Sequence, residues 1–239
     1  MTRGPFGRLL VVTLYAAAMA WVEAAVVFYL RSMMPSFDPY QPNPLPDLKG
    51  LGQAELIREA ATLVMLGTVG WLAGDTRRSR FGYAAFAFGV WDLFYYVFLV
   101  PLTRWPRSVF DWDILFLLPL PWWGPVLAPV LIAVLLVLGG GLLAWHDTAS
   151  RPVWPTRWSV ACAAVGALLA LGVFMADALR VAPQGVDALR RLLPTSFMWG
   201  PFSVALALMA VPVLDLWRQV RRLGDERQTS EAGREVSYE

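Results

Sequence analysis

Six apolar segments, each about twenty residues long, dominate the 239-residue chain. An α-helix rises about 1.5 Å per residue, so about twenty apolar residues span the roughly 30 Å hydrocarbon core of a bilayer. The sequence therefore predicts an all-α, polytopic transmembrane helix bundle of about six spans. Residues 1–217 form one transmembrane domain, whose expected spans are 9–30, 55–74, 81–102, 125–145, 158–179 and 197–217.

Composition supports the same class, because 57% of the residues are hydrophobic and only 16% are charged. Such a chain has too little polar surface to cover a water-soluble globule. Its formal net charge of +2, with no basic cluster interleaved with aromatic residues, predicts no nucleic-acid partner. Residues 218–239 are polar and mixed in charge, and we expect them to form a disordered cytoplasmic tail.

The connection between the third and fourth segments, residues 103–124, contains a short apolar run. Ile114–Leu118 is too short to span a bilayer, and Pro119 and Pro121 interrupt any helix there. The sequence predicts a short interfacial or re-entrant half-helix before the fourth span, with Asp111 or Asp113 as its N-cap.

Arginine and lysine counts predict the orientation, because basic residues concentrate in cytoplasmic loops. An even number of spans places both termini on one side. That side carries twelve Arg residues, and the opposite side carries eight Arg and Lys residues. We therefore expect a multi-pass protein of the inner membrane with both termini in the cytoplasm.

Ionisable residues within the spans lie mainly toward the side opposite the termini. Charges at mid-membrane cost roughly 2.5–3.5 kcal/mol each and are usually kept for a reason. Asp92 shares a helical face with two tyrosines, three and four residues further on. The candidate ligand-binding residues are Glu23, Arg58, Glu59, Asp92, Tyr95, Tyr96, Asp113 and Asp177. Glu55 lies nearest to water and is left out of this set.

Three hypotheses explain these intramembrane carboxylates. We favour a site that binds or translocates a small cationic or polar ligand or a lipid headgroup, because several carboxylates beside one arginine suit a hard cation or an amine. The second is a non-catalytic accessory subunit of a larger membrane complex, with the charges acting as structural ion pairs between helices. The third is a membrane-embedded acid/base enzyme, for which the sequence contains no nucleophile motif and identifies no catalytic residue.

No cofactor is expected, because His146 is the only histidine and lies outside the expected spans. A bis-histidine haem or a three-histidine zinc site needs more imidazole groups than the chain contains. No set of metal ligands can be assigned from the spacing. The expected partners are the lipid bilayer and, for an accessory subunit, other membrane subunits.

Overall fold

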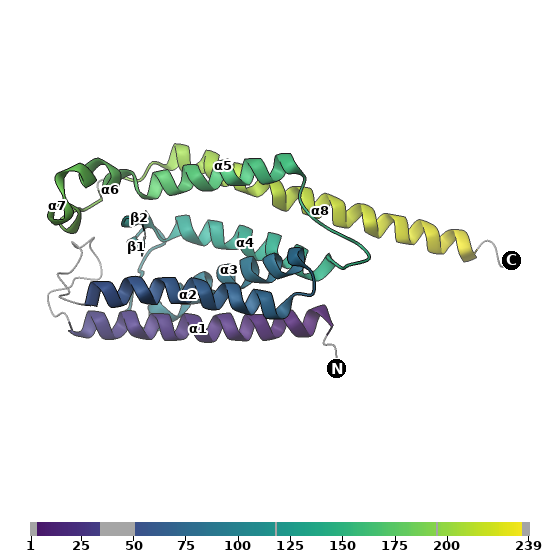
Figure 1. The fold of residues 1–239 in the computed structure, drawn as a ribbon, viewed down its shortest axis with the longest axis horizontal. Coiled ribbons are helices and arrows are strands. Elements are labelled where there is room, and N and C mark those ends of the chain that lie inside the picture. Colours follow the sequence, from purple (N-terminus) through teal and green to yellow (C-terminus); the bar gives the residue numbers. More distant parts are fainter. Residues whose placement is uncertain (1–3, 34–50, 118, 195, 236–239) are drawn as a thin grey trace.

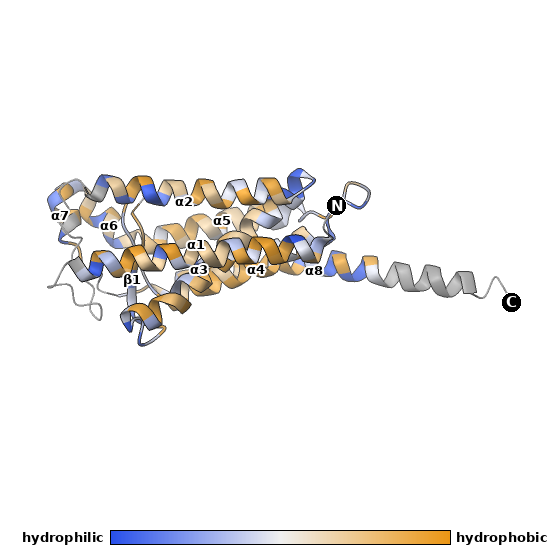
Figure 2. Ribbon diagram, turned by 90° about the horizontal axis from the view of Figure 1, so that it is seen from below, coloured by the Kyte–Doolittle hydropathy of each residue, from blue (hydrophilic) through white to orange (hydrophobic). Residues whose placement is uncertain are grey.

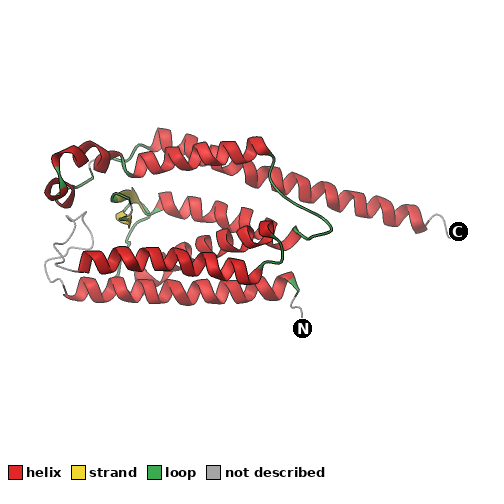
Figure 3. Ribbon diagram, in the orientation of Figure 1, coloured by secondary structure: helices red, strands yellow, loops and turns green. Residues whose placement is uncertain are grey.

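The computed structural model describes residues 4–33, 51–117, 119–194 and 196–235. Six of its helices are long and apolar enough to cross a membrane, which confirms the predicted helix bundle (Figures 1 and 3). They are α1 (Pro5–Met33), α2 (Leu51–Ala73), α3 (Arg77–Thr103), α4 (Leu127–His146), α5 (Arg157–Phe174) and α8 (Trp199–Glu235).

Large apolar side chains cover the outside of the bundle. Trp158 is 83% exposed and Leu72 is 78% exposed. Exposed apolar surface of this extent is unfavourable in water, whereas it suits contact with lipid chains. Figure 2 shows hydrophobic residues along the middle of the bundle and hydrophilic residues gathered toward its two ends. The protein is therefore a multi-pass membrane protein.

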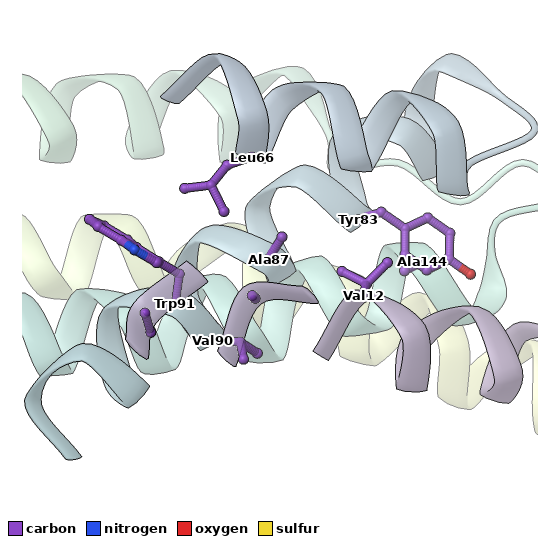
Figure 4. Close-up of a cluster of buried hydrophobic side chains, with 9 residues drawn as sticks. Val12, Leu66, Tyr83, Ala87, Val90, Trp91 and Ala144 are labelled. Carbon is purple, nitrogen blue, oxygen red and sulfur yellow. The ribbon is translucent and has the colours of Figure 1, made fainter. Parts of the chain in front are cut away.

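Helix α3 lies at the centre of a group formed by α1 to α4. A buried cluster, drawn in Figure 4, includes Val12 of α1, Leu66 of α2, Tyr83 and Trp91 of α3, and Ala144 of α4. Helices α5 and α8 form a separate pair, which packs on α4 through α8 (Figure 1).

The predicted half-helix before the fourth span is wrong. The described residues between α3 and α4 form an antiparallel hairpin of β1 (Trp112–Phe116) and β2 (Trp122–Pro125), in which Asp113 pairs with Gly124. Prolines in the connection disfavour a helix, while the tryptophans, Ile114 and Phe116 favour extended backbone. Asp113 consequently lies in a strand rather than at a helix N-cap.

Two helix ends also differ from the predicted boundaries. Helix α5 ends at Phe174 rather than at residue 179, and the chain continues into α6 (Ala176–Val181), a 3₁₀ turn (Ala182–Gln184) and α7 (Val186–Arg190). Helix α8 runs to Glu235, through most of the segment for which composition predicts a disordered tail. Extending an existing helix avoids the cost of nucleating a new one, which accounts for its length.

The two ends of the bundle carry different elements. The hairpin end carries β1, β2, α6 and α7, and the terminal end carries the start of α1 and the emerging part of α8 (Figure 1). His146 is the last residue of α4, so it belongs to the fourth helix at the terminal end rather than lying outside it.

Candidate functional site

An ion-pair network joins α1 to α2 toward the hairpin end. The Arg58 guanidinium pairs with Glu23 of α1, and its Nε donates to Glu55 Oε2 at 2.7 Å. Glu55 and Arg58 are three residues apart on α2, so they share a face of that helix. One arginine thus neutralises part of the charge on two carboxylates, and Glu55 belongs to the cluster although it was left out of the predicted site.

Glu59 connects α2 to the hairpin. Its side chain is buried, and both carboxylate oxygens accept the backbone N–H of Leu117, at 3.2 and 3.1 Å. Leu117 follows the last residue of β1. The carboxylate therefore satisfies a backbone donor that the hairpin leaves without a strand partner.

Asp113 and Tyr96 form the third polar contact. Tyr96 Oη donates to Asp113 Oδ2 at 3.0 Å, and the Ile114 backbone N–H donates to Asp113 Oδ1 at 2.9 Å. Burial raises the pKa of Asp113 to about 6, while the charge of Arg31 and these hydrogen bonds act in the opposite direction. Asp113 lies in the hairpin, outside the spanning helices.

Glu23, Glu55, Glu59, Asp92 and Asp113, with Arg31, Arg58, Tyr95 and Tyr96, form the polar cluster at the hairpin end. Asp92 differs from the other four carboxylates of this cluster. It forms no hydrogen bond or ion pair with any residue that the structure describes. Its carboxyl group is close enough to Asp113 for the two charges to interact. Tyr95, on the same face of α3, stacks on Trp91 at a centroid distance of 6.3 Å and contacts the Tyr96 ring at 5.1 Å. Asp92 therefore lies beside a second carboxyl group and a group of aromatic rings.

Seven of the eight predicted site residues thus lie in or beside this polar cluster, and Asp177 does not join it. Asp177 lies in the first turn of α6 and pairs with Arg180 of the same helix at 3.2 Å. The break after α5 moves this residue into the segment that follows the span, so its depth cannot be read from the apolar run.

Sequence reasoning missed two contributors to the cluster. Arg31, in the last turn of α1, lies over the Trp105 ring at 4.5 Å, and its charge acts on Asp113. The Leu117 N–H is a backbone group, for which no sequence signal exists. Arg31 could have been found by its position directly after the first expected span, 9–30, because a long cationic side chain at the end of a span extends its charged group toward the polar layer.

The fold and cluster define a class: a multi-pass α-helical membrane protein with a carboxylate-rich polar cluster at one end. Among the described residues there is no group of three His, Cys, Asp or Glu side chains that could hold a metal ion. Comparison with known proteins finds no match to a family model, a curated protein or a solved structure.

Proposed function

We propose that the protein binds a small cation at Asp92 and Asp113, within the membrane. The observation that carries the proposal is the state of Asp92, a carboxyl group in a spanning helix that has no hydrogen-bond or ion-pair partner among the described residues. Ionisable groups at such depth are costly and are by default candidates for function. A bound cation would supply the missing partner.

Charge balance within the cluster supports a cationic ligand. The described part of the cluster contains five carboxyl groups, from Glu23, Glu55, Glu59, Asp92 and Asp113, and two guanidinium groups, from Arg31 and Arg58. Arg58 is occupied by its two glutamates, and Glu59 by the hairpin backbone. If all five carboxyl groups were ionised, the two guanidinium groups would leave three negative charges unbalanced. Asp92 and Asp113 are neighbours, and two neighbouring carboxylates cannot both ionise without mutual repulsion.

The surroundings favour an organic ammonium group over a bare metal ion. Trp91, Tyr95 and Tyr96 surround the face of α3 that carries Asp92. Aromatic rings attract an ammonium group through their negatively charged faces, and a carboxylate can accept its N–H donors. A metal ion would need several oxygen or nitrogen ligands, of which two carboxyl groups supply only part.

A thermal-stability measurement tests this proposal. Ethylammonium, sodium and magnesium chlorides are each added to the purified protein in mild detergent. At one hundred times its dissociation constant, a ligand of the folded state stabilises by about 2.7 kcal/mol, which raises Tm. We expect ethylammonium to raise Tm most, and Asp92→Asn to abolish that shift.

Asp187→Asn is the matched control, because Asp187 is an exposed carboxylate in α7 at the same end of the bundle. It should keep the wild-type shift. The proposal fails if no cation raises the wild-type Tm, or if Asp92→Asn responds as the wild type does.

The second candidate is an accessory subunit, favoured by the in-chain pairing of Glu23, Arg58 and Glu55. Carboxylates that are already paired within the chain act as connections between helices. Purification in mild detergent distinguishes the two: a fixed partner at constant stoichiometry supports the subunit, and a monodisperse single chain supports a self-contained binding protein.

The membrane and the orientation form part of the same proposal. We place the protein in an inner membrane with the terminal end toward the cytoplasm, because twelve Arg residues belong to that side of a six-span chain and eight Arg and Lys residues to the other. The cation site then lies in the outer half of the membrane. Cysteine accessibility at Ser150 and Ser108, in loops at opposite ends of the bundle, tests the orientation.

A further inference from the structure

An apolar groove of about 560 Å³ opens on the bundle at the terminal end, far from the carboxylate cluster. Its walls come from Leu9 of α1, from α4 between Val137 and His146, and from Val213, Leu214 and Trp217 of α8. From Val137 to Trp145 the α4 wall extends about 12 Å along the helix axis, most of the roughly 15 Å hydrocarbon depth of one leaflet. The groove therefore runs in the direction of a lipid acyl chain.

Three consecutive glycines of α4, Gly139, Gly140 and Gly141, have different surroundings. A Cβ on Gly140 would lie 2.6 Å from the Phe86 backbone nitrogen, and one on Gly139 would lie 3.2 Å from Val213. Both glycines permit close contact with a neighbouring helix. A Cβ on Gly141 would meet only the Phe86 ring, at 3.6 Å, which is ordinary contact. Gly141 lines the groove, so at this point the groove wall is backbone with no side chain.

The end of the groove carries aromatic and cationic groups. Trp145 and Trp217 line it there, and the Arg221 guanidinium lies over the Trp217 ring at 3.7 Å. His146 also lines the groove and its Nδ1 bonds the Leu142 carbonyl oxygen at 3.1 Å. Tryptophan and arginine in this order, from apolar wall to charged end, match the transition from hydrocarbon to headgroup.

Residues 213–224 of α8 carry three arginines, Arg218, Arg221 and Arg222, and one carboxylate, Asp215, so this end of the helix is positively charged. Asp215 accepts from Thr156 and Ser159, and Asp147 accepts from Arg78. A phosphate oxygen near Arg221 would therefore meet a cationic surface, which favours an anionic headgroup over a zwitterionic one.

We propose that this groove binds an anionic glycerophospholipid, with one acyl chain between α4 and α8 and the phosphate beside Arg221. The lipid covers the seam where the α5–α8 pair packs on α4, so it stabilises the docking of that pair. This site is independent of the proposed cation site, since it lies at the opposite end of the bundle.

Native mass spectrometry of the full chain in mild detergent tests the proposal, with palmitoyl-oleoyl phosphatidylglycerol or phosphatidylcholine added at equal concentration. We expect phosphatidylglycerol to be retained several-fold more than phosphatidylcholine. Arg221→Ala should weaken phosphatidylglycerol binding about fivefold, the effect expected for one arginine at a membrane surface. Gly141→Leu should fill the groove and abolish the difference between the two lipids.

Two matched controls separate the groove from general effects on the surface. Gly67→Leu makes the same change on α2, where an added Cβ meets nothing within 4 Å, and Arg77→Ala removes an exposed arginine at the same end of the bundle. Both should bind phosphatidylglycerol as the wild type does. The proposal is overturned if the two lipids bind equally, if Gly141→Leu binds as Gly67→Leu does, or if the groove is instead covered by a second copy, seen as a lipid-free dimer.

Discussion

Replacing Arg58 with methionine removes the cation that holds α1 and α2 together toward the hairpin end. Methionine keeps much of the apolar length of the side chain, so the change isolates the charge. Without Arg58, the carboxylates of Glu23 and Glu55 remain close together without a counter-ion. We expect the variant to be less stable than the wild type.

The size of the loss follows from the exposure of the three side chains. Arg58 is 25% exposed, Glu23 is 13% exposed and Glu55 is 15% exposed. Breaking a buried pair costs about 3–5 kcal/mol, and an exposed pair about 0–1 kcal/mol. Discounting for partial exposure gives about 3 kcal/mol, which lowers Tm by about 6–12 °C for a chain of this size.

A double-mutant cycle provides the measurement. Unfolding of Arg58→Met, Glu23→Gln and the double variant is followed by tryptophan fluorescence during titration of a mild detergent with sodium dodecyl sulfate. We expect a coupling of at least about 1 kcal/mol, because the double variant no longer leaves the Glu23 carboxylate without its partner, although Glu55 still loses its own. Arg77→Met, at an exposed arginine, should change stability little. Losses that add to within about 0.5 kcal/mol would show that the pair does not join the helices.

Three further predictions use the same titration. Burial raises the pKa of Asp113 from 3.8 to about 6 in the folded protein. The folded state therefore binds this proton more tightly than the unfolded state does, so the contribution of Asp113 to stability is full below pH 3.8 and is lost as the pH rises through about 6. Asp113→Asn should flatten the fall in stability between about pH 4 and pH 7, and an unchanged pH profile would contradict this. Gly89→Ala places a Cβ 2.6 Å from the Ala133 carbonyl oxygen, so we expect a loss of about 1–3 kcal/mol, and a gain in stability would refute the close approach of α3 and α4. Asp147, whose side chain is fully buried, accepts three hydrogen bonds including one from Arg78, so Asp147→Ala should cost about 3 kcal/mol, and a loss below about 1 kcal/mol would contradict that role.

The number and order of the spanning helices could be predicted because they depend on local hydropathy. A run of about twenty apolar residues must satisfy its backbone hydrogen bonds internally, and a helix does this within the segment. The boundaries were less predictable. Helix α3 begins at Arg77, four residues before its predicted start, because the Thr76 and Ser79 side chains form a capping box at a charged turn.

The hairpin could not be found by the same reasoning. Its strands contain five and four residues, and their apolar composition is equally compatible with a short helix. Pairing between Trp112 and Pro125 joins residues on either side of the prolines, and such a register has no local signature.

The spacing of Asp92, Tyr95 and Tyr96 on one helical face was determined by the sequence alone, because it follows from the 3.6-residue period of the helix. Only the tertiary structure decided the partners. It assigned Glu23 and Glu55 to Arg58, Glu59 to a backbone N–H, and no described partner to Asp92. The reason is physical: a carboxylate takes whichever donor the packing of separate helices brings within about 3 Å, and that distance depends on the whole fold.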